Sequence, residues 1–580
     1  MVAQKNLYIK NKQTDSASAP AIKTSWRFGD LPAAELLPLL QRHLTAQDAD
    51  AQWQLIWLNN DGQPVIGLLP KVTWCVYFNS TEAESNHNRH VSVSSPTPIQ
   101  TADDQAAAWQ ATNYKVIKTC RDDENSVTTA YKSYSDWQDE LITYSQAFEA
   151  GNSAPTLIHE ESEKPSYHHG LIGFIGYDIA AYELSPTSNI PQASHPCAML
   201  GHYDTYLSAT KDTSSAASWC LNVRASNNDP DSEQENTFII ALISYLDSLN
   251  NTLPDSDYSN EPMPETESKL APLILMAQWS KLDYQQAFEQ TQTYLQQGDC
   301  YQINLTQAWR GQFDNSHTDK KTTTLIDYLP ALHRNTQAPF AGYLGNEVLK
   351  ANDSVSKNSS FELLSCSPEL FFTFIKDLKT GKHHIRTKPI KGTIPRGINA
   401  EQDLALKQQL TASDKDRAEN VMIVDLLRND LGKYAKTGSV KVPHLFAIES
   451  FSNVHHMVST ITAELKVDSH PLAVLFGSLP AGSITGTPKR RAVEIISELE
   501  AAPRGAYCGT MGYMNFDGSG QWNVLIRTLQ AHIPAGNIGQ VSLWAGGGIT
   551  IASDCDAEYQ ECLDKVGNLL DVLKQEAVVD

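Results

Sequence analysis

The apolar positions along this chain follow two periods, one of two residues and one of three to four. In the first half, short apolar runs separated by polar inserts predict strands, as in residues 53–58 (Trp-Gln-Leu-Ile-Trp-Leu) and residues 170–178. Glycine recurs every third residue in the second run, which is typical of close backbone packing and not of a phosphate-binding loop. Residues 250–268 are rich in Asn, Asp, Glu, Ser and Pro and predict a linker. We therefore expect two regions, residues 1–270 and residues 271–580.

Helical periodicity is concentrated in the second half of the chain. Tyr284, Phe288 and Leu295 recur at helical spacing before Gly298. Similar patterns predict helices over residues 283–297, 400–410, 414–431 and 557–574, and strands over residues 301–306 and 361–375. Because strands and helices do not strictly alternate, the pattern favours an α+β fold over a doubly wound parallel sheet.

Composition narrows the class of partner. The chain has 580 residues, a formal net charge of −22 and an isoelectric point of about 5.2. An acidic surface argues against nucleic acid and anionic membranes as main partners, although a locally positive site can still bind a small anion. The nine cysteines form no C-x-x-C pair, the start has no apolar signal region, and no run approaches the ~18 apolar residues of a membrane span. We expect a cytoplasmic protein with reduced thiols.

One lysine stands in an unusual local setting. Lys391 lies in residues 388–397 (Lys-Pro-Ile-Lys-Gly-Thr-Ile-Pro-Arg-Gly), between two prolines that fix the backbone. Gly392 beside it lets another group approach the backbone closely. This arrangement can hold one amine beside a ligand. The ordinary alternative is a surface loop with a solvated lysine.

Two pairs of acids have the spacing of neighbours on a helix face. Asp416 and Glu419 are three residues apart in one predicted helix, and Glu558 and Glu561 repeat this spacing in the last one. Apolar residues flank both pairs, so we expect both helices to be partly buried. Four carboxylates on two such helices suit Mg²⁺, which prefers oxygen ligands and keeps some of its waters. The alternative is that they are exposed acids on amphipathic helices.

Three further residues are candidates for proton transfer or anion binding. Glu369 follows the turn Ser-Cys-Ser-Pro before an apolar strand, and is either a general acid or base or a strand-edge acid. His456 shares a strand face with valines, so we expect a buried histidine, catalytic or structural. Arg527 lies within an apolar strand-like run, where its guanidinium needs a partner, and a carboxylate fits its fork.

Two glycine-rich runs invite comparison with anion-binding loops. Residues 482–489 (Gly-Ser-Ile-Thr-Gly-Thr-Pro-Lys) fail the P-loop pattern, because Thr487 and Pro488 stand where its glycine and lysine belong. The glycines at 546–548 lie between a strand and the last helix, where they form either an anion-binding nest of N–H groups or a tight turn. Taken together, these features favour a Mg²⁺-dependent enzyme that acts on a small polycarboxylate.

The motifs, in their order, resemble the chorismate-utilising enzymes, and within that family chiefly the aminodeoxychorismate synthases (component I). The similarity extends over about residues 275–575, whereas the first half matches mainly at residues 170–178 and 201–204. The matching runs are residues 298–307, 365–369, 386–393, 419–431, 455–459, 481–486, 504–509, 526–528, 545–549 and 558–565.

The resemblance implies a fold and a reaction. The implied fold is an α/β sandwich of two mainly antiparallel sheets with flanking helices. In the implied reaction, chorismate binds with Mg²⁺ and ammonia replaces its C4 hydroxyl. The product, 4-amino-4-deoxychorismate, leads toward 4-aminobenzoate and folate. Because no cysteine here resembles an amidotransferase nucleophile, we expect a separate glutamine amidotransferase subunit to supply the ammonia.

The resemblance also implies roles for the catalytic candidates. Lys391 takes the place of a lysine that adds to C2 of the ring before ammonia displaces it. An amine must be neutral to attack, so we expect burial or a nearby cation to lower the pKa of Lys391. Glu369 takes the place of the general acid or base, and His456 that of a histidine near the departing hydroxyl.

The metal and substrate residues follow in the same way. Glu419 and Glu561 match direct Mg²⁺ ligands, and Asp416 and Glu558 match neighbours that act through water. The residues that match substrate contacts or the pocket wall are Gly392, Thr393, Ser483, Tyr507, Arg527, Gly546, Gly547, Gly548 and Lys565.

Two alternatives and one further site follow from the same family. The anthranilate synthases (component I, tryptophan biosynthesis) share nearly all these motifs, but they have alanine at the position of Lys391 and aminate C2 directly. This position therefore favours amination at C4. A non-catalytic subunit that binds only a small acid or an amidotransferase is a third hypothesis, against which the complete set of acids argues. Some relatives bind tryptophan, and Pro339, Phe340 and Ala341 match one side of that site, with Ala341 in place of a serine.

Overall fold

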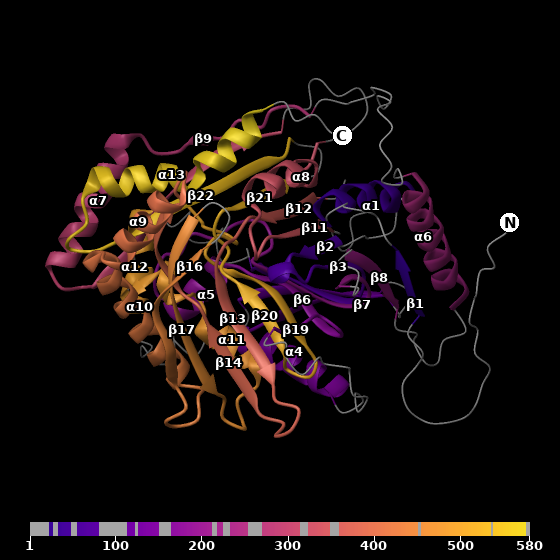
Figure 1. The fold of residues 1–580 in the computed structure, drawn as a ribbon. Helices are drawn as coiled ribbons and strands as arrows, with labels where there is room; N and C mark the ends of the chain where they lie inside the picture. Colours follow the sequence, from indigo (N-terminus) through magenta and orange to yellow (C-terminus); the bar gives the residue numbers. More distant parts are fainter. Residues whose placement is uncertain are drawn as a thin grey trace, which may run out of the picture.

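The described strands of the protein form one continuous antiparallel sheet in the computed structural model (Figure 1). The expected α+β class with antiparallel pairing is therefore confirmed. The two sheets we expected are joined to each other instead of separate. The residues that the structure describes are 22–26, 33–47, 55–79, 113–121, 126–149, 164–211, 217–223, 232–252, 270–313, 323–348, 359–450, 454–500, 502–534 and 538–575.

The sheet has two layers, which we call the β10 layer and the β17 layer. The β10 layer has the order β1 (Ile22–Trp26), β8 (Ala217–Val223), β7 (Ala198–Lys211), β3 (Val65–Phe78), β2 (Leu55–Leu58), β11 (Gly342–Val348), β12 (Ser359–Ser365), β21 (Thr528–Ile533), β22 (Gln540–Ile549) and β10 (Gln302–Gln312). The short strands β9 (Met276–Ala277) and β18 (Gly486–Thr487) also pair with β10.

The β17 layer uses β3 and β7 again. Its order is β5 (Ser126–Lys132), β4 (Tyr114–Cys120), β3, β7, β6 (Gly170–Ile175), β19 (Thr510–Asn515), β20 (Gly520–Asn523), β13 (Leu370–Lys376), β14 (His383–Thr387), β17 (Val454–Glu464) and β16 (Lys441–Ser450). Strand β15 (Ile390–Pro395) pairs with β17 beside β14.

The strands β3 and β7 pass from one layer to the other. Residues 65–67 of β3 pair with β2, residues 72–78 pair with β4, and the pairing with β7 is irregular between Gly67 and Val72. Pro70 lies at this irregularity, where the missing N–H of proline is tolerated. Because a β-bulge bends and twists its strand, the irregular segment lets both strands serve both layers.

Side chains from both layers fill the space between them. Ile172 and Phe174 of β6 share this core with Phe361 and Leu363 of β12, and the ring centroids of Phe174 and Phe361 are 5.7 Å apart. Residues that alternate with these along the same strands pack in the cores under the helices. Burial on both faces explains why such strands read as continuous apolar runs in the sequence.

Helices cover the outer faces of the sheet. Helix α13 (Cys555–Lys574) packs on β22 beside α7 (Lys281–Gln296) and α8 (Leu325–Thr336), and α10 (Asp414–Gly432) packs on β15 and β17 (Figure 1). Among the described residues, no helix is both long and apolar enough to cross a membrane. The other helices are α1 (Ala33–Gln47), α4 (Tyr134–Glu149), α5 (Tyr177–Leu184), α6 (Ser232–Thr252), α9 (Ala400–Thr411), α11 (Pro471–Ser478) and α12 (Lys489–Leu499), with 3-10 turns η1 (Asn60–Gly62) and η2 (Gly482–Ile484).

The four predicted helices of the second half are confirmed within a few residues at each end, as α7, α9, α10 and α13. α7 starts at a capping box formed by Ser280 and Asp283, and it ends before Gly298, whose φ is +80°. α10 is capped by Ser413, whose hydroxyl accepts a hydrogen bond from the N–H of Asp416. Local capping chemistry therefore accounts for these boundaries.

The predicted strand over residues 361–375 is wrong in one respect. Residues 366–369 interrupt it, so that β12 and β13 are separate strands. Pro368 lies in the interruption and cannot donate a ladder hydrogen bond. This break carries Glu369 away from the sheet, which matters for the site described below.

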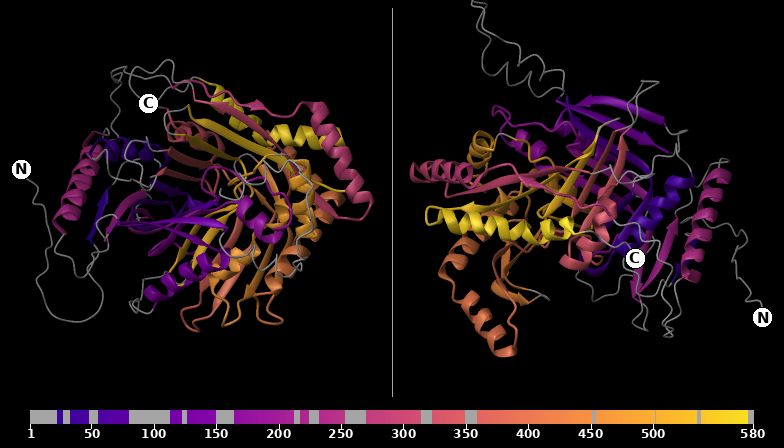
Figure 2. Two further views of the ribbon diagram at one scale, coloured as in Figure 1. Left: turned by 180° about the vertical axis from the view of Figure 1, so that it is seen from behind. Right: turned by 90° about the horizontal axis from the view of Figure 1, so that it is seen from above.

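The two regions expected from the sequence share their strand pairing. β2 pairs with β11, and β6 pairs with β19, so strands from residues 1–270 lie between strands from residues 271–580 (Figure 2). The glycines of β6 permit this: a Cβ on Gly170 would lie 2.0 Å from the carbonyl oxygen of Met514. Most of the predicted linker lies outside the described residues, and the boundary near residue 270 stays a prediction.

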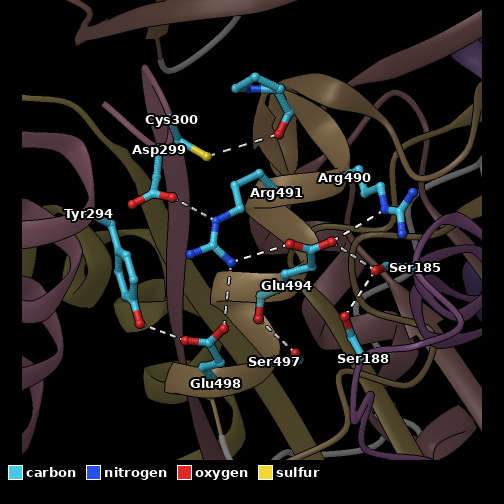
Figure 3. A network of polar contacts seen from close by, with 11 residues as sticks. Ser185, Ser188, Tyr294, Asp299, Cys300, Arg490, Arg491, Glu494, Ser497 and Glu498 are labelled. Carbon is cyan, nitrogen blue, oxygen red and sulfur yellow. Dashed lines mark hydrogen bonds and ion pairs between the residues drawn. The ribbon is translucent and has the colours of Figure 1, made fainter. Parts of the chain in front are cut away.

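A polar network fixes the outer side of α12 (Figure 3). Arg491 lies at its centre, with Nε 2.9 Å from Oδ1 of Asp299 and Nη1 3.2 Å from Oε2 of Glu494. Tyr294 donates a 2.6 Å hydrogen bond to Glu498, which also lies 3.7 Å from Arg491. Tyr294 and Asp299 belong to the end of α7 and the loop that follows it, so the network holds α12 beside the entry into β10.

Candidate active site

Every residue that the sequence assigned to catalysis, metal binding or substrate binding lines one cavity of about 610 Å³. The cavity is bounded by β15, β17, β22, α10, α13 and η2, which are far apart along the chain. These residues are Lys391, Glu369, His456, Gly392, Thr393, Ser483, Tyr507, Arg527, Gly546, Gly547, Gly548, Lys565, Asp416, Glu419, Glu558 and Glu561.

Lys391 lies on β15, and its Nζ is 2.7 Å from Oε2 of Glu419. The two side chains are only 21% and 9% exposed. Burial lowers the pKa of Lys391, but Glu419, followed by Glu561 and Glu558, outweighs burial and raises the pKa above its ordinary value. We expected a lowered pKa and a neutral amine. This expectation is wrong for the structure as it stands, because Lys391 is a cation paired with Glu419.

The expected close approach at Gly392 is confirmed. Gly392 has φ +86°, in the left-handed region that favours glycine, and a Cβ there would lie 2.9 Å from Cγ of Asp416. The glycine therefore lets the first turn of α10 pack directly against β15. This contact brings the acids of α10 beside Lys391.

The acids of α10 and α13 face one another across the cavity but are interleaved with lysines. Lys415 Nζ is 3.6 Å from Oε1 of Glu558 and 4.0 Å from Oε1 of Glu419. Lys565 Nζ is 2.8 Å from Oε1 of Glu561, its neighbour four residues earlier on α13. In the part of the chain that the structure describes, no three His, Cys, Asp or Glu side chains converge closely enough to hold a metal ion.

The donor set nevertheless has the chemistry that a hard divalent cation requires. Glu419 and Glu558 are buried carboxylates, and a buried carboxylate needs a counter-charge. Ammonium groups supply that charge here, and an ion held by carboxylate oxygens from both helices would supply it equally. The residues therefore fit Mg²⁺, provided that the lysines release them.

Glu369 lies in the break between β12 and β13. The hydroxyl of Ser367 shapes this turn, because it donates to the carbonyl oxygen of Val524 (2.6 Å) and accepts from the N–H of Glu369 (3.2 Å). Glu369 is 8% exposed. Burial raises its pKa to about 7, against the lowering effect of Lys391 and Lys565. A carboxyl group with this pKa can donate or accept a proton near neutral pH.

His456 and Thr393 face each other across β15 and β17. The register places them opposite, and Oγ1 of Thr393 is 2.8 Å from Nδ1 of His456. Burial and the nearby Arg527 lower the pKa of His456 to about 4, so its imidazole is neutral at neutral pH. The predicted burial of His456 is confirmed, whereas the adjacent His455 does not line the cavity.

The sequence indicated that Arg527 lies within a strand, and this prediction is wrong. Arg527 precedes β21 in a left-handed conformation with φ +51°, which costs of order 1–3 kcal/mol for a residue other than glycine. Burial lowers the pKa of its guanidinium. No described carboxylate forms an ion pair with Arg527, which lines the cavity. Its fork is therefore available for a carboxylate of a bound molecule.

The glycines at 546–548 form neither the nest nor the turn that the sequence suggested. Gly546, Gly547 and Gly548 belong to β22 and pair with β10, so that successive N–H groups point in opposite directions. A Cβ on Gly546 would lie 2.1 Å from the carbonyl oxygen of Leu305, and one on Gly547 would lie 2.8 Å from Oε2 of Glu558. Glycine is needed here because a strand and an acid approach the backbone.

Tyr507, Ser483 and Lys565 complete the walls of the cavity. The ring of Tyr507 stacks on that of Trp544 with 6.1 Å between centroids. Ser483 lies in η2, and Lys565 donates a 2.8 Å hydrogen bond to the carbonyl oxygen of Gly546. Their contacts with substrate stay predictions, although their shared position is the one that such contacts require.

The segment Pro339, Phe340 and Ala341 lies away from this cavity. The N–H of Asn59 donates to the carbonyl oxygen of Ala341 (2.8 Å), and that of Asp61 donates to the carbonyl oxygen of Pro339 (2.7 Å). The tryptophan site that we expected at this segment stays a prediction.

Lys415 and Asn304 also line the cavity, and the sequence reasoning missed them as site residues. Lys415 precedes Glu419 by four residues on a predicted helix, and this spacing is a signal that could have singled it out. Asn304 carries no comparable local signal, because it reaches the cavity through the pairing of β10 with β22.

Comparison with known proteins assigns the chain to a family. A family model described as chorismate binding enzyme matches residues 100–571. This chain belongs to the chorismate-binding enzymes. Aminodeoxychorismate synthase component 1 of Salmonella typhimurium is 35% identical over 461 residues, which are 79% of this chain and 87% of that protein. The protein of the same name from Escherichia coli is 34% identical over 459 residues, which are 78% and 86% of the two chains.

A solved structure supports the fold of this chorismate-binding enzyme. Anthranilate synthase component I from Streptococcus pneumoniae matches with a TM-score of 0.54 and 22% sequence identity, over 83% of this chain and 95% of that one. At this identity the match bears on architecture alone. It agrees with the mixed architecture of a large antiparallel sheet flanked by helices.

Proposed function

We propose that this chorismate-binding enzyme converts chorismate and ammonia to 4-amino-4-deoxychorismate. One observation carries the proposal: Lys391, at the position that separates amination at C4 from amination at C2, lies inside the cavity beside the acids. Relatives named aminodeoxychorismate synthase component 1 cover most of the chain, which supports the same activity.

In the proposed reaction, Lys391 is the nucleophile and Glu369 the general acid. The neutral amine of Lys391 adds to C2 of the ring, the double bonds shift, and the C4 hydroxyl leaves as water with a proton from Glu369. Ammonia then adds at C4, the double bonds shift back, and Lys391 leaves C2. One proton moved from Lys391 to Glu369 before the first step brings both groups into the required state, and both side chains line the same cavity.

The remaining polar groups orient the substrate. His456 is held by Thr393 near the place from which the hydroxyl leaves, and its lowered pKa keeps it an uncharged partner. Arg527, which has no described ion-pair partner, would bind one carboxylate of chorismate through its fork. Tyr507 and Lys565 lie where they can contact the same anionic groups.

Mg²⁺ belongs to this proposal as a cofactor. Glu419 and Glu561 would hold it, with Glu558 and Asp416 beside them. When bound, the ion supplies positive charge that fixes a substrate carboxylate. Because Glu419 is the group that raises the pKa of Lys391, its engagement with another cation would also favour the neutral amine.

We also propose a glutamine amidotransferase subunit as the partner that delivers ammonia. The term component 1 in the names of the relatives implies a second component in those systems. Most cysteines of this chain are buried, and burial raises the pKa of several of them, which makes those thiols poor nucleophiles.

A product assay with ammonium as nitrogen source tests the proposal. The protein is incubated with chorismate, Mg²⁺ and ammonium, followed by a lyase that converts 4-amino-4-deoxychorismate to 4-aminobenzoate. The expected product is 4-aminobenzoate, whereas anthranilate would favour amination at C2 and an absence of turnover would favour a binding subunit. Intact-mass analysis with chorismate should also detect an adduct on Lys391, and its absence at every time point would contradict the covalent route.

A further inference from the structure

One buried arginine touches three walls of the cavity. Nη2 of Arg504 donates to the carbonyl oxygen of Asn304 on β10 (2.8 Å), and Nη1 donates to that of Ile484 on η2 (3.4 Å). Tyr507 follows three residues later, and its N–H donates to the carbonyl oxygen of Arg504 (3.2 Å). Asn304, Ile484 and Tyr507 all line the cavity, whereas Arg504 lies behind them and is 2% exposed.

The guanidinium is itself held in a fixed orientation by Glu500. Nε and Nη2 of Arg504 each lie 2.7 Å from an oxygen of this carboxylate, so that the pair is bidentate. The same carboxylate accepts hydrogen bonds from the N–H and the hydroxyl of Thr306 on β10 (2.8 and 3.0 Å). A bidentate pair fixes direction as well as distance. Glu500 follows α12, the helix whose outer side is fixed by the Arg491 network (Figure 3).

The backbone around Arg504 is fixed from two other elements. Asp178, in the first turn of α5, accepts hydrogen bonds from the N–H groups of Arg504 (3.1 Å) and Gly505 (2.9 Å). Gln530 of β21 donates to the carbonyl oxygen of Arg504 (2.8 Å) and accepts from the N–H of Ala506 (3.1 Å). Residues 504–506 are therefore bound on both sides immediately before Tyr507.

We propose that Arg504, oriented by Glu500 and Asp178, is a positioning residue that sets Asn304, Ile484 and Tyr507 relative to one another around the bound substrate. This inference rests on the proposed function of the cavity. A structural ion pair needs only the bond between Arg504 and Glu500, yet two further N–H groups of this guanidinium go to main-chain carbonyls of the cavity wall. The network also gives residues 1–270 a role in the site, because Asp178 belongs to that region.

The test is Arg504→Lys, with Arg491→Lys as matched control. Both arginines pair with a glutamate near α12, but the partners of Arg491 (Asp299, Glu494 and Glu498) do not line the cavity. Lysine keeps the charge of Arg504 and loses the fork that reaches both carbonyls. Because a misplacement of about 1 Å can cost on the order of 10²-fold in rate, we expect kcat to fall about 10- to 100-fold while KM changes less than about threefold.

The control and a second variant keep the test decisive. Arg491→Lys should keep kcat within about twofold even if its Tm falls as much as that of Arg504→Lys. Should Arg504→Lys fail to fold, Glu500→Gln is the second variant. Glutamine keeps the shape of Glu500 but has one uncharged acceptor oxygen in place of two, so we expect a smaller loss of the same kind in kcat. If the wild-type enzyme is active and these variants keep its kcat, the positioning role of Arg504 is wrong while the proposed function stands. A wild-type enzyme without turnover would overturn the proposed function, and this inference with it.

Discussion

Lys391 and Glu369 line the same cavity, but different effects set their charge. The carboxylate of Glu419 keeps Lys391 protonated, whereas burial raises the pKa of Glu369 to about 7. The acid is thus ready to exchange a proton near neutral pH, while the amine is not yet a nucleophile. At the scale of residues, lysine ammonium groups pair with the acids of the cavity.

The role of Lys391 predicts a large loss of rate without it. Lys391→Ala should lower the rate of C4 amination more than about 10²-fold, equivalent to about 2.7 kcal/mol of transition-state stabilisation. Lys388→Ala is the control, because Lys388 pairs with Glu449 and does not line the cavity. Steady-state production of 4-aminobenzoate in the coupled assay measures both. A rate close to that of the wild type in Lys391→Ala would rule out a covalent intermediate on this residue.

The raised pKa of Glu369 predicts the pH dependence of kcat. The reactive state holds a single proton, on Glu369 and not on Lys391, whereas both groups are protonated below pH 7, so kcat should rise as pH rises through about 7 and then level off. His456 titrates near pH 4 and does not contribute in this range. Glu369→Gln cannot donate a proton, and its residual kcat should show no change of slope near pH 7. A wild-type kcat that stays level between pH 6 and about 9 would exclude Glu369 as the acid.

At the scale of elements, α10 and α13 were predictable and β22 was not. The helical spacing of apolar residues, the capping residue and the spacing of the acids all lie within or directly before the sequence of each helix itself. The run Gly546 to Gly548 reads as a loop, because its strand character comes from the backbone of β10 beside it. The lysines that pair with the acids, and the left-handed turn at Arg527, likewise depend on contacts between distant segments.

The helix acids predict a change in metal dependence. Glu419→Gln should raise the Mg²⁺ concentration needed for half-maximal activity by at least about tenfold, since even partners of metal ligands typically contribute 10- to 100-fold. Asp425→Asn is the control, because Asp425 lies on the same helix but is exposed and pairs with Arg428. Magnesium titrations of both variants give the result. An unchanged titration in Glu419→Gln would remove this residue from the ligand set.

Two glycines, one in β22 and one in α13, predict different effects of substitution by alanine. Gly547→Ala places a Cβ 2.8 Å from Oε2 of Glu558 and should displace this acid. We expect turnover to fall and the Mg²⁺ concentration needed for half-maximal activity to rise. Gly567→Ala, within α13, meets no atom within 4 Å and should stabilise the protein by about 0.5–1 kcal/mol through helix propensity. Thermal unfolding and turnover distinguish the two. Full activity in Gly547→Ala would show that turnover does not depend on the present position of the Glu558 carboxylate.

At the scale of the whole molecule, the strand order binds the two regions of the sequence into one fold. β2 lies beside β11, β6 lies beside β19, and β3 and β7 extend through both layers. Asp178 adds a polar link from α5 to the segment before Tyr507. The sequence indicated which residues form the site, but its division near residue 270 says nothing of this interleaving.

Interleaving predicts that the second region does not fold alone. A fragment of residues 271–580 would expose the edges of β11 and β19, together with the core faces that β2 and β6 cover. We expect it to aggregate or to unfold without a cooperative transition, whereas the full chain unfolds cooperatively. Circular dichroism during heating and size-exclusion chromatography measure this. A monomeric fragment with a sharp transition would contradict the expectation.

The pairing of β10 with β22 has a consequence for synthesis of the protein. About 230 residues separate these partners, so at 5–20 residues per second a ribosome needs roughly 10–50 s to add the second after the first. During that interval the nascent chain carries the strand Gln302–Gln312, with the apolar side chains of Ile303, Leu305 and Trp309, without its neighbour β22. This pair therefore cannot form until almost the last helix has been synthesised, and an unpaired strand edge can pair with other chains during that interval.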